Sequence, residues 1–465
     1  MLNESGWLSD EVNEDWLTTP ELTLDQYDNY YFNFSHKINS HPNETIFGVY
    51  VSENYDGVNP ANADWTKIKS IIWPENDNYE FLYSGTIDLS AYAGKTIHIA
   101  FKFVTTSTEH PRWYVKNLNL MGTNGDLPYS PKTFNMNPGA YNLPEITGVQ
   151  LDGNLAFISH SGNNKKLHRI SVVDISNRTS IIEKTKYSFS QFSYYFNFYP
   201  QDSLLTVYLD ENTTRFYRFD ENDNIIEKGS IINQDAKLKY IKDNHALVAV
   251  SGDNFRIFDI SDEENPLPVF QFSNTYSENI AIDKENNYLY LAVPDGWNSI
   301  IEKWDISDIS APEKLNDYNL SAKVNNEIHF NNNVLYVMDK WGVSGTNPVN
   351  YGRLTAYKLS GTEFVEAGHY QVSSPKGISF NDDYAFMGVG SGNGETETGV
   401  HIISLQNPEN LKRKYLLAGG GSLIDLAADN NVLTVAYPNK MDLYDLNSLP
   451  LPPSEFDLVS PQGTI

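Results

Sequence analysis

A repeated pattern of short strands most strongly limits the folds open to this chain of 465 residues. Seven times, a polar turn precedes a β-branched or aromatic run, and a second such run ends in another polar turn, often of the Asp-Ile-Ser type. The first turns begin at Asp152, Gln201, Asp243, Glu285, Asn331, Asp382 and Asp429. The second turns begin at Asp174, Asp220, Asp259, Asp305, Lys358, Ser404 and Asp445, about 45 residues apart on average. That spacing is typical of one four-stranded propeller blade.

Two further strands complete each unit. A short innermost strand such as 279–282 precedes the first turn, and a fourth strand such as 267–272 follows the second. Helical periodicity with capping signals is absent from the sequence, so we predict an all-β chain. Seven units of four strands account for residues 143–459, which predicts a seven-bladed β-propeller there. The spacing also admits six or eight blades.

The repeats resemble the LVIVD family of bacterial surface propellers. The resemblance is strongest over residues 247–266, a nearly intact copy of the repeat, and residues 288–312 are the next most similar. Blades two, five and seven depart from the family pattern. The resemblance implies a propeller fold and a bacterial cell-surface or extracellular location, and it implies no particular reaction.

The first 122 residues do not share the repeat. They contain a different series of blocks: 15–24, 47–56, 64–66, 84–101 and 113–117. This series resembles the cleaved-adhesin, or choice-of-anchor J, domain of Bacteroidetes surface proteins, which is a jelly-roll β-sandwich of the galactose-binding-like kind. The resemblance implies a jelly-roll domain over residues 1–122. It also implies that a structural calcium ion could bind there, although Lys116, beside Asn117, stands where the family usually has an aspartate.

The boundary between the two regions falls at residues 123–142, where three prolines, two glycines and little periodicity predict a linker. Residues 460–465 form a short polar tail. No leader is evident at the start of the sequence, as would also hold for a chain from which a leader had been removed.

Charge and composition exclude several classes of partner. The chain has 33 basic and 60 acidic residues, a formal net charge of −27, which argues against nucleic acid and anionic lipid. Its apolar runs are far shorter than the roughly 20 residues of a membrane span, so we expect no membrane-spanning segment. The absence of cysteine excludes disulfides and thiolate metal sites.

Catalytic motifs are also missing from the sequence. It contains neither the His-Glu-x-x-His pair of zinc hydrolases nor the Gly-x-Ser-x-Gly turn of serine hydrolases. Three polar residues on predicted innermost strands, Glu327, His329 and Asp425, could face the central channel, where polar side chains commonly contact water. We therefore predict no catalytic residues and no cofactor, and we expect a protein that is not an enzyme.

The strongest candidate for a binding site lies in three long loops of blades four, five and six: 294–299, 339–352 and 390–399. Each joins the second and third strands of its blade, so the three should cluster on one face. Trp297, Trp341 and Tyr351 in these loops could stack on sugar rings; the alternative is that they pack between blades. The predicted function is binding of a glycan or a cell-surface protein. The alternatives are a polysaccharide-degrading enzyme or an envelope scaffold.

Overall fold

The computed structural model describes most of the chain, leaving gaps at both ends and in several connections. The described ranges are 13–39, 47–73, 82–105, 112–123, 132–135, 145–161, 168–177, 180–189, 197–201, 204–209, 213–219, 224–231, 236–250, 254–273, 279–322, 324, 327–343, 349–390, 397–418, 423–429 and 431–446. Within these ranges the only helices are two 3-10 turns, η1 (Pro60–Asn62) and η2 (Ser90–Tyr92), so the all-β prediction is confirmed. None of the described helices is long and apolar enough to cross a bilayer. The tail predicted at 460–465 lies outside the described residues.

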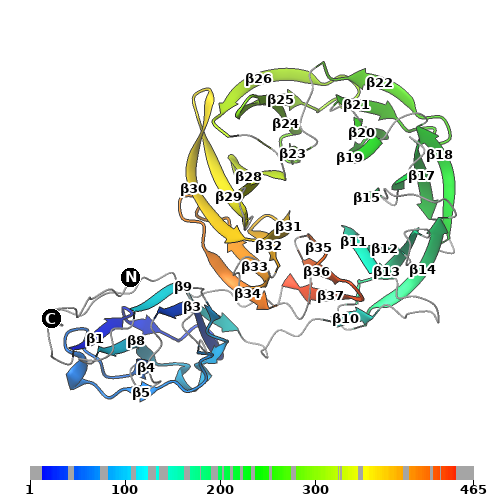
Figure 1. Ribbon diagram of the computed structural model, residues 1–465. Helices are drawn as coiled ribbons and strands as arrows, with labels where there is room; N and C mark the ends of the chain where they lie inside the picture. Colours follow the sequence, from blue (N-terminus) through cyan, green and yellow to red (C-terminus); the bar gives the residue numbers. More distant parts are fainter. Residues whose placement is uncertain are drawn as a thin grey trace.

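The N-terminal region contains two β-sheets (Figure 1, blue). The first has the order β1 (Asn13–Thr18), β8 (Thr96–Thr105), β4 (Phe47–Ser52), β5 (Thr66–Lys67), and β2 (Leu22–Thr23) also pairs with β8. The second has the order β6 (Leu82–Tyr83), β3 (Asn29–Asn39), β7 (Ile87–Asp88), and β9 (Arg112–Thr123) also pairs with β3.

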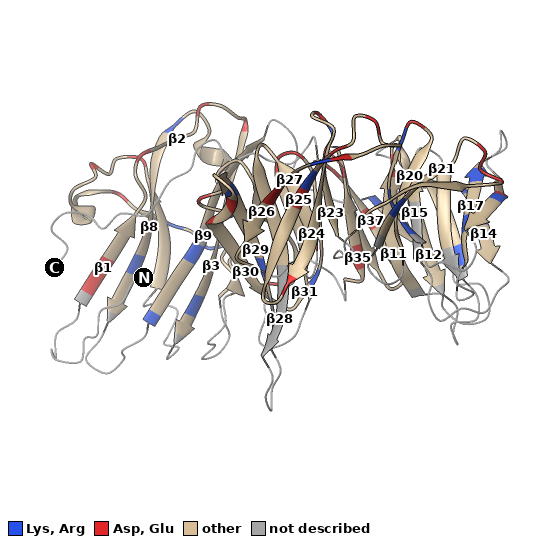
Figure 2. Cartoon of the chain, turned by 90° about the horizontal axis from the view of Figure 1, so that it is seen from above, with Lys and Arg blue, Asp and Glu red and all other residues tan. Residues whose placement is uncertain are grey.

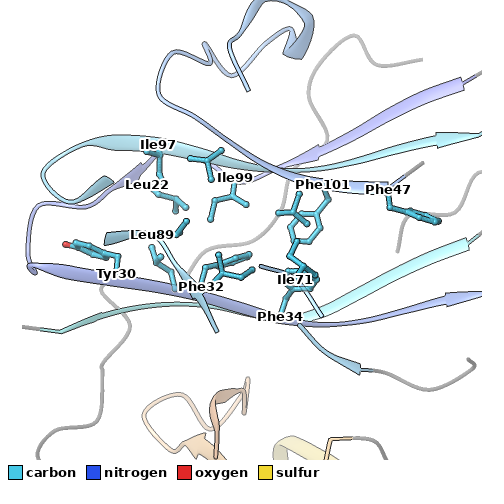
Figure 3. Close-up of a cluster of buried hydrophobic side chains, with 14 of the residues drawn as sticks. Leu22, Tyr30, Phe32, Phe34, Phe47, Ile71, Leu89, Ile97, Ile99 and Phe101 are labelled. Atoms are coloured by element: carbon cyan, nitrogen blue, oxygen red, sulfur yellow. The ribbon is translucent and has the colours of Figure 1, made fainter. Parts of the chain in front are cut away.

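The two sheets enclose one hydrophobic core, drawn in Figure 3. Alternate residues of β3 point inward, including Tyr30, Phe32 and Phe34, and they meet Ile97, Ile99 and Phe101 of β8. The β3 residues between them, which include Tyr31 and Ser35, point to the other face of β3 and are also buried, so this strand is covered on both faces. The sheets are therefore held together chiefly by aromatic and β-branched side chains.

The rest of the chain forms four-stranded antiparallel groups arranged in a ring (Figure 1). The first three groups are β11 (Glu145–Asp152), β12 (Leu155–Ser161), β13 (His168–Asp174), β14 (Ile182–Phe189); β15 (Asn197–Gln201), β16 (Leu204–Leu209), β17 (Thr213–Phe219), β18 (Ile225–Ile231); and β19 (Ala236–Lys242), β20 (His245–Val250), β21 (Asn254–Asp259), β22 (Leu267–Gln271). In each group the strands follow chain order from the centre outward.

Two of the next groups join into one eight-stranded sheet. Its members are β23 (Ile280–Asp283), β24 (Tyr288–Asp295), β25 (Asn298–Asp305), β26 (Glu313–Leu320), and β27 (Ile328–Asn331), β28 (Val334–Val343), β29 (Val349–Ser360), β30 (Glu363–Ser373). The outer strands β26 and β30 pair in parallel, with Asn319 opposite Glu363 and Leu320 opposite Phe364. A further group consists of β31 (Pro375–Phe380), β32 (Tyr384–Val389), β33 (Gly399–Ser404) and β34 (Arg413–Ala418).

The outer strand of the last group comes from a segment that precedes the ring strands in the sequence. The group contains β35 (Asp425–Ala428), β36 (Val432–Tyr437), β37 (Lys440–Asp445) and, at its outer edge, β10 (Lys132–Asn135). Thr133 Oγ1 donates to Asp442 Oδ1 at 2.6 Å across this pairing. The segment 123–142, predicted to be only a linker, therefore contributes a strand, because β37 leaves an unpaired edge that β10 covers.

The repeated polar turns explain why the chain folds into these groups. At several of them an asparagine adopts a left-handed conformation, as at Asn244 (φ 57°), Asn287 (φ 57°) and Asn333 (φ 62°), which tight hairpins between antiparallel strands require. At the Asp-Ile-Ser turns, the aspartate accepts a hydrogen bond from the backbone two residues later, as Asp305 does from Ser307 at 2.8 Å. The sequence repeat is therefore a repeat of turns.

The N-terminal sheets pack against the ring beside β34 (Figure 1). Tyr31 and Met121 join a core cluster with ring residues that include Val400 and Tyr415. At the same junction the Arg413 guanidinium donates to Ser35 Oγ at 2.7 Å and lies 3.3 Å from the Glu397 carboxylate. Lys116 Nζ lies 3.6 Å from Glu397. The contact between the two regions thus combines apolar packing with a buried ion pair.

Candidate functional site

The structure places the predicted binding residues on hairpins at one edge of the ring. Hairpins β24–β25, β28–β29 and β32–β33 belong to three successive four-stranded groups. Each hairpin joins the second and third strands of its group, so all three point to the edge opposite the β23–β24 and β27–β28 turns. Figure 2 shows the ring edge-on.

Trp297 lies at the tip of the first hairpin. Strand β24 continues to Asp295 and β25 begins at Asn298, so the predicted loop is only a two-residue turn, Gly296-Trp297. Gly296 has φ +62°, the conformation that a first central glycine supplies in tight hairpins. The Trp297 side chain is 90% exposed, whereas the other exposed large apolar side chains range from 38% to 63%. It therefore does not pack between sheets.

Trp341 and Tyr351 lie in strands, and the expectation that residues 339–352 form a loop is wrong for most of the segment. Strand β28 runs to Val343 and β29 starts at Val349, with Trp341 directly opposite Tyr351. Aromatic and β-branched residues favour cross-strand pairing, which explains why the hairpin extends. The structure describes the backbone of these two residues and leaves their side chains outside the described part.

The third predicted loop, 390–399, lies mostly outside the described residues. Strand β32 ends at Val389 and β33 begins at Gly399, and Glu397 just before β33 belongs to the junction with the N-terminal sheets. The described part of this hairpin therefore faces the other region of the chain and adds no aromatic side chain to Trp297.

Two of the three polar residues predicted on innermost strands, His329 and Asp425, have structural contacts, whereas Glu327 lies just before β27. The His329 ring stacks on Phe380 of the next group, with centroids 4.5 Å apart and planes at 5°. Asp425 accepts hydrogen bonds from the backbone N–H of Val149 at 3.0 Å and of Leu426 at 2.9 Å, which ties the last group to the first. Burial raises the pKa of Asp425 to about 6. Glu327 is exposed.

The calcium ion implied for the N-terminal region stays a prediction. Among the described residues, no group of three or more His, Cys, Asp or Glu side chains is placed to hold a metal ion. Lys116, the residue that departs from the family pattern, contacts Glu397 of the ring.

The structure also contains a pocket that was not predicted from the sequence. This pocket of about 500 Å³ lies between the β23–β26 group and the β27–β30 group, lined by residues that include Tyr290, Lys303, Tyr318, Phe330 and Lys358. These residues lie on strands β24 to β29, and only the pairing of whole groups brings them together. Tyr290 lies near the start of β24 and Trp297 follows its end, so the pocket and the Trp297 turn lie toward opposite edges of the ring.

A ring of radial four-stranded antiparallel groups defines a β-propeller protein. No protein-family model matches the chain. No curated protein sequence is significantly similar to it either. The resemblances to LVIVD propellers and to cleaved-adhesin domains therefore stay predictions.

Three similar solved structures are matched over almost the whole length of their chains. A chain from a structure titled "Crystal Structure of Mitotic Checkpoint Complex" is 11% identical, with a TM-score of 0.45, covering 70% of this chain and 99% of that one. The Dos1 propeller is 10% identical, with a TM-score of 0.45, covering 68% and 95%. Hydrazine synthase of Kuenenia stuttgartiensis is 14% identical, with a TM-score of 0.43, covering 70% and 97%. Because these similarities are so distant, the propeller assignment rests on the sheet topology and not on them.

Proposed function

We propose that the chain is a non-enzymatic binding protein of the bacterial cell surface, in which a jelly-roll sandwich precedes a seven-bladed propeller. The four-stranded groups from β11 to β37, closed by β10, support this blade count. The two facing N-terminal sheets support the sandwich. The family resemblances of the sequence support the location.

The proposed ligand is a glycan bound at the edge that carries Trp297, Trp341 and Tyr351. The observation that carries this proposal is the 90% exposed Trp297 side chain at a tight turn. An indole ring in water offers a flat apolar face, against which the C–H groups of a sugar ring can pack. On the neighbouring hairpin, Trp341 lies opposite Tyr351 in the strand pairing, which supports a wider aromatic surface than Trp297 alone.

Replacing Trp297 by Ala should weaken glycan binding by about 1–3 kcal/mol, roughly tenfold or more in Kd. The melting temperature should change little, because an exposed turn residue contributes little packing. Retardation in affinity gels containing a panel of polysaccharides measures the first quantity, and thermal unfolding measures the second. Trp341→Ala and Tyr351→Ala test the neighbouring hairpin in the same way.

Trp304→Ala is the matched control, because Trp304 is 7% exposed on the strand that follows the same turn and donates to Glu302 at 3.0 Å. This variant should lose stability, by about 3–5 kcal/mol. Unchanged gel retardation of Trp297→Ala on every polysaccharide that the parent protein binds would contradict the proposed edge. Sustained release of reducing sugar or unsaturated product from the same panel would favour an enzyme. Partner proteins that co-purify without any glycan retardation would favour a scaffold.

A further inference from the structure

The pocket between the fourth and fifth groups of the ring has a charge opposite to that of the chain. Its lining contains two lysines, Lys303 and Lys358, and no aspartate or glutamate. The chain as a whole carries a net charge of −27, and Asp and Glu crowd the turns along the edge of the ring in Figure 2. A lysine-lined hollow in such a surface favours an anionic group over a cationic one.

Lys303 is the cation that this pocket can offer to a ligand. Its Nζ lies 3.5 Å from the centroid of the Tyr288 ring and 5.9 Å from that of Tyr290. Among the described residues, no carboxylate lies within ion-pair distance of Lys303, although its charge helps to lower the pKa of Asp305. Lys358, in contrast, already pairs with Glu409 at 3.0 Å. The aromatic contact fixes the Lys303 ammonium group, while its N–H donors stay available to a carboxylate.

The aromatic residues provide the apolar wall of the pocket. Tyr290 and Phe330 stack with centroids 4.2 Å apart and planes at 21°, and Tyr318 meets Phe364 edge to face at 5.5 Å. Tyr290 is 3% exposed, and no hydrogen bond of its hydroxyl to another described residue is found. This hydroxyl is not among the buried atoms that lack a partner, so it reaches accessible space and can contact a ligand. Burial also raises the pKa of Tyr290, so this hydroxyl is a donor at neutral pH.

The mouth of the pocket adds neutral polar groups. Asn332 and Asn333 are exposed at the β27–β28 turn, both with positive φ (49° and 62°). Side-chain amides both donate and accept hydrogen bonds, which suits the hydroxyl groups of a sugar. The volume of about 500 Å³ lies within the range of small-ligand sites.

We propose that this pocket binds a hexuronic acid residue of an acidic saccharide. The carboxylate contacts Lys303, the hydroxyl groups contact Tyr290, Asn332 and Asn333, and the ring lies against the aromatic wall. This site is separate from the Trp297 edge and does not depend on it, because the two lie toward opposite ends of β24.

The probe is di-galacturonate, compared with the neutral galactobiose, by isothermal titration calorimetry on the full chain. We expect the acidic disaccharide to bind and the neutral one to bind at least about tenfold more weakly, because a charge-assisted hydrogen bond contributes about 1.5–3 kcal/mol. Lys303→Gln should lower the affinity for di-galacturonate by a similar factor, and Lys303→Arg should keep most of it. Tyr290→Phe removes only the hydroxyl and should weaken binding by a smaller factor.

Lys284→Gln is the matched control, because Lys284 is an exposed lysine on the β23–β24 turn that does not line the pocket. It makes the same change of net charge and should leave the affinity unchanged. Thermal unfolding of each variant separates lost binding from lost folding. Equal affinity for both disaccharides, no binding of di-galacturonate, or equal effects of Lys284→Gln and Lys303→Gln would each overturn the proposal. Loss of di-galacturonate binding in Trp297→Ala but not in Lys303→Gln would overturn it while leaving the Trp297 edge intact.

Discussion

Arg413→Met should lower the free energy of unfolding by about 3–5 kcal/mol, because it leaves a buried carboxylate without its main partner. Arg413 is 1% exposed and Glu397 is 3% exposed. Burial alone would raise the pKa of Glu397, but the positive charges of Arg413 and Lys116 hold it below its usual value. Glu397 is therefore ionised in the native protein, and once the guanidinium is removed only the more distant and exposed Lys116 faces its charge.

Two further variants make this prediction specific. The double variant Arg413→Met with Glu397→Gln should recover much of the loss, because it removes the unpaired charge as well. Arg215→Met, which breaks the more exposed pair with Glu227 at 3.0 Å, should cost less than about 1 kcal/mol. Chemical denaturation measures all three. A loss for Arg413→Met no larger than that for Arg215→Met would show that the junction does not depend on this ion pair.

Lowering the pH below 6.5 should destabilise the protein steeply, because four largely buried histidines are held neutral. Burial lowers the pKa of His36, His160 and His329 to about 4 and that of His401 to about 3. The unfolded chain would protonate these groups near pH 6.5, whereas the folded chain would not. Their stabilising contribution is therefore complete above pH 6.5 and is lost as the pH falls toward 4.

Burial is the main reason that His36 stays neutral, although its hydrogen bond with the Ile72 carbonyl oxygen raises the pKa; the contact with Trp113 also fits the neutral ring. Trp113 Nε1, which can only donate, lies 3.3 Å from His36 Nδ1, and His36 Nε2 lies 2.9 Å from the carbonyl oxygen of Ile72. The ring must accept at Nδ1 and donate at Nε2, which only the neutral form can do. His401 has a similar arrangement, with Tyr370 Oη 2.8 Å from Nδ1 and the Glu397 carbonyl oxygen 2.7 Å from Nε2.

The titration of the Asp425 carboxyl changes the free energy of unfolding with pH in the opposite direction to the histidines. The pKa of this carboxyl is raised to about 6, so the folded chain binds this proton more tightly than the unfolded chain between about pH 6 and pH 4. Four protons taken up by the histidines of the unfolded chain against one bound by Asp425 in the folded chain leave a net loss of about 4 kcal/mol per pH unit near pH 5. Urea unfolding at pH 7, 6 and 5 measures this slope.

Single histidine variants identify the groups responsible for the slope. His36→Gln can keep both hydrogen bonds without a titrating ring, so it should reduce the slope by about 1.4 kcal/mol per pH unit. His369→Gln, on an exposed side chain, is the matched control and should leave the slope unchanged. A parent protein equally stable at pH 7 and pH 5 would contradict the role of the buried histidines.

Local patterns in the sequence predicted the local structure well. The run Ala246–Val250 after the turn at Asp243 is strand β20, and the runs that follow Glu285 and Asn331 begin β24 and β28. These predictions succeed because a turn residue and the alternation of a strand act within a few residues of each other. The limits of hairpins were less predictable: residues 339–343 were expected in a loop but continue strand β28.

Long-range contacts could not be predicted from local sequence patterns. No local pattern marks Lys132–Asn135 as the outer strand of the last group, because its partner β37 lies about 300 residues later and any free strand edge could accept it. The junction of Arg413 with Ser35, and the pocket between β24 and β29, likewise join residues that carry no shared signal. The sequence by itself determined the class of fold, since period-two runs and polar turns recur at blade spacing. Only the tertiary structure decided how the ring closes, which charges are buried and where side chains from different sheets meet, because these depend on packing between groups that are each locally complete.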